Sequence, residues 1–443
     1  MTEHRKIIDD LISCALRSVD PVQAVRDNLS ISGHSLLVED REYDLREIKR
    51  IKVVGAGKAA APMARAVGDV LLDRVDGGLI IVKHGHDSPA SDLSPIELVC
   101  ASHPVPDAGG VLATGRIMTL AGDLDREDLL VTVISGGCSA LLVSPAPGIS
   151  LEDKQSVIRV LLESGASIHQ INTVRKHLSS IKGGRLAQAA FPARTISLIV
   201  SDVVGDAPDT IGSGPTAPDP TTFTEAMHVL TDFGLDRRVP RSVVERLKRG
   251  AAGDHRETPT DDDPCFRNVQ NIVIRTGRHA ANAVVKEASR HGFNAVIVET
   301  PLEGSARDAG SMIASMARAV VESGRPERRP ACLVFFGETT VNVTGDGRGG
   351  RNQELALAAA IAIDGLQGVT IATLATDGQD GPTDAAGAVV DSRTIQHARK
   401  LGLDPERYLA NNDSYSFFDA LDGLIHTGNT LTNVADLTFA LID

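Results

Sequence analysis

Short apolar runs alternate with amphipathic helical patterns along most of the chain. In the first half, residues 51–54, 79–82, 96–101, 129–134 and 195–200 form such runs and predict β-strands. Strands that alternate with helices at this spacing are typical of βαβ units, in which the strands form a mainly parallel sheet. The first half is therefore predicted to be an α/β domain, preceded by a helix over about the first 28 residues.

A second series of apolar runs follows a polar segment at residues 254–264. This segment is predicted to be an exposed loop or a domain linker. The later predicted strands are 272–274, 295–298, 332–336, 369–373 and 437–442. Because 443 residues are too many for one ordinary core, we predict two α/β domains, at residues 1–250 and 265–443, with a cleft between them. The final residues of the chain could also pack back on the first domain.

Composition narrows the class of protein. The chain has 42% hydrophobic and 23% charged residues, as globular proteins do. A net charge of −13 and only 3% aromatic residues argue against a nucleic-acid partner. No apolar run is long enough to span a membrane. The five cysteines are scattered without a CxxC pair, and no signal-peptide pattern begins the chain, so a cytoplasmic location is predicted.

The stretch from Gly345 to Glu354 has the most distinctive pattern in the chain. It carries four glycines and two arginines, Arg348 and Arg351, between a strand-like run at 339–344 and a helical run at 352–363. Glycine allows close approach of a ligand to the backbone, and a helix start offers N–H groups to an anion. Arginine adds a planar fork that suits carboxylate or phosphate. The stretch is predicted to be an anion-binding turn.

A second glycine turn, Gly55-Ala-Gly-Lys-Ala-Ala60, follows the first predicted strand. It satisfies G-x-G-x-x-A, the dinucleotide-binding pattern. That pattern also needs an acidic residue near the end of the next strand, where this chain has Lys83 and His84. The absence of an acidic residue there argues against NAD as a bound cofactor, whereas NADP stays possible. A plain strand–helix turn with a solvated Lys58 is the other interpretation.

Further polar residues follow other predicted strands. Consecutive N–H groups of Ser135-Gly-Gly-Cys-Ser139 could surround a phosphate or carboxylate, with Cys138 as a packed small residue. Asp202 and Asp377 lie in strand-end loops, where a carboxylate holds Mg²⁺, accepts a substrate proton or simply caps a turn. Lysine, arginine, carboxylates and glycine turns without a redox or nucleophile motif favour phosphoryl transfer. From the residues alone, the prediction ends at an anion-binding α/β enzyme.

The motifs taken together resemble the class II glycerate 2-kinases, which carry a C-terminal MOFRL domain. The resemblance spans about residues 5–440. The matching motifs are GAGKAA from Gly55, SHPVPD from Ser102, SGGCSAL from Ser135, NTVRKHLS from Asn172, KGGRL from Lys182, SDVVGD from Ser201 and GGRNQE from Gly349.

The resemblance implies ATP-dependent phosphorylation of D-glycerate at its 2-hydroxyl, with a divalent metal such as Mg²⁺. It also implies a Rossmann-like N-terminal domain, a MOFRL-type C-terminal domain and an active site in the cleft between them. The expected partners are D-glycerate and a nucleotide, with no nucleic acid or membrane, and a homo-oligomer is left open. An NAD(P)H-dependent hydroxypyruvate reductase and a non-catalytic anion-binding protein are the competing hypotheses.

The resemblance also suggests roles for individual residues. Lys58 and Arg351 would neutralise the transferring phosphoryl group. Asp202 would orient the 2-hydroxyl or bind the metal, with Asp377 as a second metal ligand. The predicted substrate and nucleotide residues are Gly55, Gly57, Ser135, Gly136, Gly137, Ser139, Arg175, Glu338, Gly349, Gly350 and Asn352.

Overall fold

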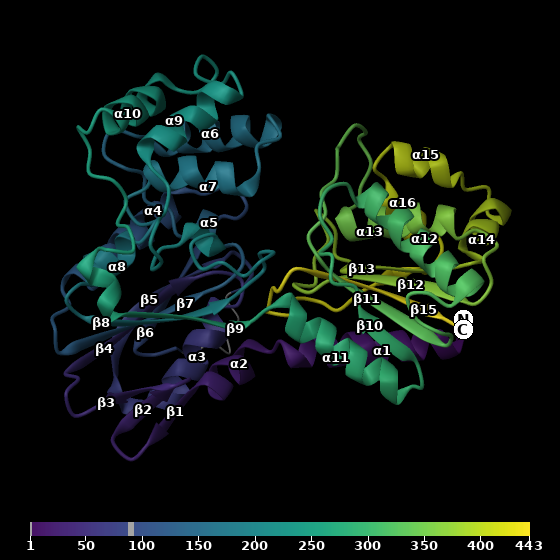
Figure 1. The fold of residues 1–443 in the computed structure, drawn as a ribbon, viewed down its shortest axis with the longest axis horizontal. Helices are drawn as coiled ribbons and strands as arrows, with labels where there is room; N and C mark the ends of the chain where they lie inside the picture. The colour runs from purple at the N-terminus through teal and green to yellow at the C-terminus, as the bar shows by residue number, and fades with distance from the viewer. Residues whose placement is uncertain (1, 87–92) are drawn as a thin grey trace. The chain divides into compact units, whose positions relative to one another are not determined.

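The computed structural model describes residues 2–86 and 93–443, which form two compact units (Figure 1). The N-terminal unit comprises Pro21–Ser201 and Gly205–Ile274, and the C-terminal unit comprises residues 2–20, Asp202–Val204 and Arg275–Asp443. These bounds differ from the predicted ranges. The first helix packs on a helix of the C-terminal unit, and the predicted strand at 272–274 belongs to the N-terminal sheet instead of starting the second series.

The N-terminal unit contains a six-stranded sheet, a three-stranded sheet and two groups of helices. Its strands are β1 (Leu29–Ser32), β2 (Ser35–Val38), β3 (Arg41–Asp44), β4 (Arg50–Ala56), β5 (Val75–Lys83), β6 (Ile96–Ala101), β7 (Asp128–Ile134), β8 (Arg194–Val200) and β9 (Val269–Arg275). Its helices are α2 (Pro21–Asn28), α3 (Ala60–Leu71), α4 (Ala108–Gly122), α5 (Cys138–Leu141), α6 (Leu151–Glu163), α7 (Ile168–His177), α8 (Arg185–Ala190), α9 (Phe223–Asp232) and α10 (Arg241–Ala251), with short 3-10 turns at Leu72–Arg74, Ile211–Ser213 and Pro264–Asn268.

The large N-terminal sheet has the strand order β6-β5-β4-β7-β8-β9, and the pairs from β6 to β8 are parallel. Counted along the chain, this is the order 3-2-1-4-5-6 of a doubly wound sheet. Every residue of β7 is buried, as expected for a central parallel strand. Helix α3 covers one face and α4 with α8 the other (Figure 1). The strand order reverses between β4 and β7, where such sheets bind their ligands.

Four helices of the N-terminal unit, α6, α7, α9 and α10, pack into a separate apolar core. Leu161, Val174, Phe223 and Leu247 are fully buried in it. Because α7 carries polar residues as well as these core contacts, this helical layer fixes the orientation of Asn172 and Arg175.

The C-terminal unit is a mixed α/β layer structure. Its strands are β10 (Asn294–Ile297), β11 (Ala331–Gly337), β12 (Val369–Ala375), β13 (Gly387–Asp391), β14 (Leu424–Ile425) and β15 (Asp436–Ile442). Its helices are α1 (Thr2–Ser18), α11 (Gly277–Arg290), α12 (Ala306–Ser323), α13 (Arg351–Ala362), α14 (Thr394–Lys400), α15 (Pro405–Ala410) and α16 (Ser414–Asp419). Helices α1 and α11 cover one face of the sheet, and α12 to α16 cover the other (Figure 1).

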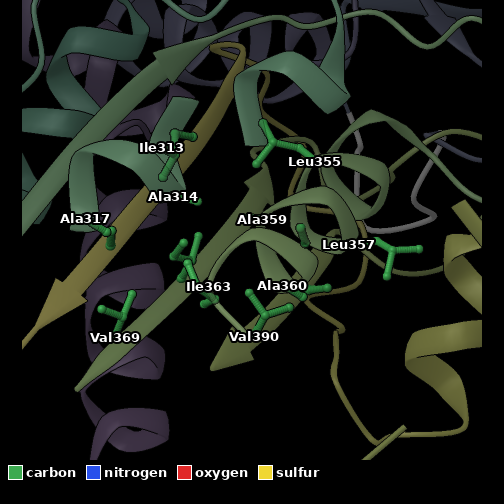
Figure 2. Close-up of a cluster of buried hydrophobic side chains, with 14 of the residues drawn as sticks. Ile313, Ala314, Ala317, Leu355, Leu357, Ala359, Ala360, Ile363, Val369 and Val390 are labelled. Carbon is green, nitrogen blue, oxygen red and sulfur yellow. The ribbon is translucent and has the colours of Figure 1, made fainter. Parts of the chain in front are cut away.

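The C-terminal sheet has the order β10-β11-β15-β12-β13-β14, in which only β10 and β11 are parallel. The last strand, β15, is therefore central in this sheet and belongs to the C-terminal unit. Figure 2 shows the core, to which Ala317 of α12, Ala360 of α13 and Val369 of β12 contribute. A Cβ at Gly310 would lie 2.4 Å from the carbonyl oxygen of Leu355, so this glycine permits the close packing of α12 on α13.

Several local predictions need correction. The predicted N-terminal helix is two helices, α1 and α2, because Pro21 restricts the residue before it. Residues 29–44 form the antiparallel β1-β2-β3 sheet, whose short strands lack a clear apolar pattern. The run at 339–344 is not a strand, since only Thr340 forms an isolated bridge, with Ser305. In the described part of the chain, no helix is long and apolar enough to cross a membrane.

Candidate active site

The turns after β4 and β7 are locked together at the carboxyl edge of the N-terminal sheet. The backbone N–H of Lys58 donates to the carbonyl oxygen of Gly136 at 2.9 Å, and that of Ala59 donates to Ser135 Oγ at 2.9 Å. A Cβ at Gly55 would lie 2.0 Å from the Val133 carbonyl oxygen, and one at Gly57 would lie 2.2 Å from Ser135 Oγ. These glycines allow the two turns to touch each other.

This packing weakens the dinucleotide-binding interpretation. In a dinucleotide site the second glycine leaves room for the pyrophosphate, and the helix start donates N–H groups to it. Here the protein itself fills the space beside Gly57 and accepts from the N–H groups of Lys58 and Ala59. Lys83 is the last residue of β5, where the ribose-binding acid would stand.

The Ser135–Ser139 loop keeps donors available. In residues 2–86 and 93–443, no protein acceptor is present for the N–H groups of Gly136, Gly137 and Ser139. Gly137 has a φ of 84°, and a Cβ there would lie 3.2 Å from the ring of His103 and 3.6 Å from Lys58 Cγ. Lys58 and His103 therefore flank the loop, which supports the predicted anion-binding turn. Cys138 itself is buried, as a packed small residue would be.

Two cationic side chains reach the same loop from the other direction. Arg175 Nη1 donates to Ser139 Oγ at 3.2 Å and to Asn172 Oδ1 at 2.9 Å. Lys182 Nζ donates to Ser139 Oγ at 3.4 Å and to the Gly212 carbonyl oxygen at 2.9 Å. Burial lowers the pKa of Arg175 to about 10 and that of Lys182 to about 7. Arg175 is one of the predicted substrate and nucleotide residues. Lys182 is the first residue of the KGGRL motif and was not a predicted site residue.

The predicted residues of the C-terminal unit gather at one edge of its sheet. Glu338 directly follows β11, Asp377 is the second residue after β12 and Asp436 begins β15. Since β15 runs antiparallel to both β11 and β12, these three positions lie at the same edge. Arg351, at the start of α13, donates to Asp436 at 2.5 and 3.0 Å and also to Glu338. Burial alone would lower the pKa of Arg351, but these carboxylates raise it above its ordinary value.

The N-terminus of α13 does not present open donors to a ligand. Its N–H groups at Asn352 and Gln353 donate to the carboxylate of Asp380 at 3.0 and 2.8 Å, and the Asn352 amide donates to it as well. Burial raises the pKa of Asp380 to about 7. The predicted anion-binding turn is therefore occupied by an anion of the protein itself. Of the residues in this stretch, Arg351 is the one that contacts the strand-end carboxylates Asp436 and Glu338.

The glycines of this stretch allow close contact between protein segments. None of Gly345, Gly347, Gly349 and Gly350 has a positive φ. A Cβ at Gly349 would lie 2.3 Å from Ser414 Oγ, and one at Gly350 would lie 2.4 Å from Asp380 Oδ1. Arg348 stacks on the Tyr415 ring, with 4.1 Å between Cζ and the ring centroid, so it is not simply solvated.

Replacing Gly350 with alanine is expected to destabilise the protein by about 1–3 kcal/mol, because the new methyl group would overlap the Asp380 carboxylate that caps α13. The denaturation midpoint in urea measures the loss. Gly115→Ala is the matched control, since a Cβ there meets nothing within 4 Å and the residue lies inside α4. An equal midpoint for both variants would contradict the overlap.

Asp202 and Asp377 do not form a complete metal cage. The Asn433 amide donates to Asp202 Oδ2 at 2.8 Å, and the Gln379 N–H donates to Asp377 Oδ1 at 3.0 Å. Among the described residues there is no group of three or more His, Cys, Asp or Glu side chains placed to hold a metal. Mg²⁺ commonly uses only one or two protein carboxylates together with water and substrate phosphates, so these residues fit it as partial ligands.

A cavity of the C-terminal unit lies elsewhere. It has a volume of about 540 Å³ and is lined by Thr370, Asp391 and Lys400, among others. Thr370 lies near the start of β12, at the edge opposite Arg351. None of the predicted site residues lines this cavity.

The fold and the two strand-end clusters define an α/β protein with a doubly wound unit that carries backbone N–H donors and cationic side chains at its switch point. Residues 7–248 match the family described as a domain of unknown function, DUF4147, and residues 331–436 match the MOFRL family. Glycerate 2-kinase of Pyrococcus horikoshii is 41% identical over 433 residues, which are 98% of this chain and 96% of that protein.

A solved structure of a glycerate kinase is also similar to this chain. That of glycerate kinase from Thermotoga maritima has a TM-score of 0.84 and 39% identity, and the match covers all of both chains. A protein of Agrobacterium vitis named provisionally as a hydroxypyruvate reductase is 42% identical over 89% of this chain and 99% of its own. This chain belongs to the glycerate kinase family with DUF4147 and MOFRL domains, as the sequence motifs predicted.

Proposed function

We propose that this protein is a glycerate 2-kinase that transfers the γ-phosphoryl group of ATP to the 2-hydroxyl of D-glycerate. The observation that carries the proposal is the cationic loop at the switch point of the doubly wound sheet. Its open N–H groups, flanked by Lys58 and backed by Arg175, suit anionic reactants. The full-length similarity to glycerate kinases of two organisms supports the same activity.

In this proposal, the 2-hydroxyl oxygen forms a bond to the γ-phosphorus as the bond between that phosphorus and the β–γ bridging oxygen breaks. The products are 2-phosphoglycerate and ADP, and the hydroxyl proton leaves to a base. Lys58 and Arg351 neutralise the negative charge on the phosphoryl oxygens. Asp202 orients the hydroxyl and accepts its proton, or else serves with Asp377 as a ligand of Mg²⁺, which supplies further charge neutralisation when bound.

Other predicted residues bind a reactant or hold the catalytic groups in place. The Gly136–Ser139 backbone binds an anionic group of a reactant. Glu338 holds the Arg351 guanidinium, and Asn352 helps to anchor Asp380 at the start of α13. The cytoplasmic location and a homo-oligomeric state stay predictions from the sequence.

The hydroxypyruvate reductase alternative has less support. A reductase of this fold needs a dinucleotide site, and the turn after β4 packs on the turn after β7 where the pyrophosphate would lie. The residue at the end of β5 is Lys83 in place of the expected acid.

A paired assay tests the two functions. The protein is incubated with D-glycerate, ATP and Mg²⁺, and ADP formation and the phosphoglycerate product are followed, with phosphorus NMR to distinguish the 2- from the 3-phosphate. Hydroxypyruvate with NADH or NADPH is run beside it. We expect ADP and 2-phosphoglycerate in equal amounts and no oxidation of either reduced cofactor. Reduction of hydroxypyruvate without ADP formation would overturn the kinase proposal.

A further inference from the structure

Partly buried Arg175 and fully buried Lys182 form a positive cluster without a carboxylate partner. Both side chains donate to Ser139 Oγ, at 3.2 and 3.4 Å. Their other acceptors are neutral, namely Asn172 Oδ1 and the carbonyl oxygen of Gly212. Within the described residues, neither cation forms an ion pair, although Lys182 is fully buried.

A neighbouring lysine, Lys176, is compensated by carboxylates. Lys176 is also buried, and its Nζ lies 3.2 Å from Asp209 and 3.2 Å from Asp219. Two carboxylates therefore compensate one cation on α7. Arg175, the residue before it, and Lys182 share a serine oxygen instead.

The serine hydroxyls beside the two cations belong to one hydrogen-bond network. Ser213 Oγ donates to Asn172 Oδ1 at 3.0 Å, so its own proton is engaged. Ser139 Oγ, 2.8 Å from Ser213 Oγ, then donates to it and accepts from Arg175 and Lys182. Ser139 is only partly buried and belongs to the loop with open N–H groups.

An uncompensated buried charge destabilises a folded protein, and a second one beside it adds repulsion. We propose that Arg175, Lys182 and Ser139 form the subsite that binds the carboxylate of glycerate. This inference rests on the proposed kinase activity and adds the part of the substrate that these residues hold. The planar guanidinium, the ammonium and the adjacent N–H groups of Gly136 and Gly137 match a carboxylate, which carries its charge throughout the reaction.

The protonation of Lys182 gives the proposal a pH signature. Burial lowers its pKa to about 7; Arg175 also lowers it, and Cys138 raises it. The other titratable side chain that couples to it is Lys154, whose pKa burial lowers well below its ordinary value. Only protonated Lys182 attracts a carboxylate, so glycerate binding should weaken as the pH rises above about 7.

The test compares Lys182→Met with wild type in steady-state kinase assays at several pH values. We expect the KM for D-glycerate of the variant to rise at least about tenfold at pH 6.5, since the variant loses a charge-assisted contact with the carboxylate. The KM for ATP should stay within about twofold of the wild-type value. Wild-type KM for glycerate should rise with pH above 7, and the variant should lose this dependence. Lys248→Met, on the exposed side of α10, is the matched control.

Each result decides the proposal. A variant KM for glycerate within threefold of wild type overturns it, as does a rise in the KM for ATP in place of that for glycerate, which would assign the subsite to a nucleotide phosphate. If Lys182→Met does not fold, Ser139→Ala and the wild-type pH profile decide instead. If wild type does not phosphorylate glycerate, the kinase function is wrong, and calorimetric titration of D-glycerate into wild type and Lys182→Met still decides whether the cluster binds this carboxylate.

Thermal stability separates a substrate-binding role of Lys182 from a purely structural one. Removing an uncompensated buried charge should leave the melting temperature of the unliganded protein unchanged or raise it. The same concentration of D-glycerate should raise the melting temperature of wild type more than that of Lys182→Met. A lower melting temperature together with an unchanged response to glycerate would show that Lys182 serves only the fold.

Discussion

Arg351→Ala is expected to lower kcat/KM for glycerate phosphorylation by about 10²–10³, the usual cost of removing one group that stabilises transition-state charge. The same substitution should also destabilise the protein by about 3 kcal/mol, because it leaves the buried carboxylate of Asp436 without its partner. Steady-state kinetics and urea denaturation measure the two effects separately.

Two variants separate the catalytic role of Arg351 from its structural one. Arg351→Lys keeps the charge but loses the fork that spans both oxygens of Asp436, so it should recover part of the stability and less of the activity. Arg348→Ala, in the same glycine-rich stretch, should retain wild-type activity, since Arg348 packs on Tyr415. If Arg351→Ala keeps kcat/KM within threefold of wild type, about 0.7 kcal/mol, Arg351 has no catalytic role.

Lys58→Ala should abolish most activity while leaving the fold intact. Lys58 is half-buried beside the Ser135–Ser139 loop, and its role in the turn depends on its backbone N–H, which alanine keeps. We expect kcat to fall about 10²–10³ and the KM for glycerate to change little, because the lysine acts on the phosphoryl group in the transition state.

Lys52→Ala provides the control for Lys58. Lys52 lies earlier on β4, where its Nζ donates to the Asp76 carbonyl oxygen, so its loss should cost no activity. Equal kcat values for the two variants would remove Lys58 from the mechanism. A raised KM for glycerate at unchanged kcat would assign Lys58 to substrate binding instead.

Part of this fold could be predicted from local sequence patterns. The strands β4 to β8 were predicted within a few residues because buried parallel strands are continuous apolar runs that end at glycine turns. The sheet β1-β2-β3 was missed, because its strands are short and largely exposed. Strand β9 was predicted to belong to the second series of strands but lies in the N-terminal sheet, because an apolar run does not specify which strand it will pair with.

The sequence by itself determined the α/β class, the family and the two turns that carry Lys58 and Arg351, because these depend on local apolar spacing and on contiguous motifs. Only the tertiary structure decided what those residues contact. Asp380 caps α13 from 28 residues away, and Asp436 reaches Arg351 across 85 residues. The shared contact of Arg175 and Lys182 with Ser139 likewise depends on packing. Charge compensation is a property of spatial neighbours, and neighbours this distant in the chain are set by how the sheets and helices assemble.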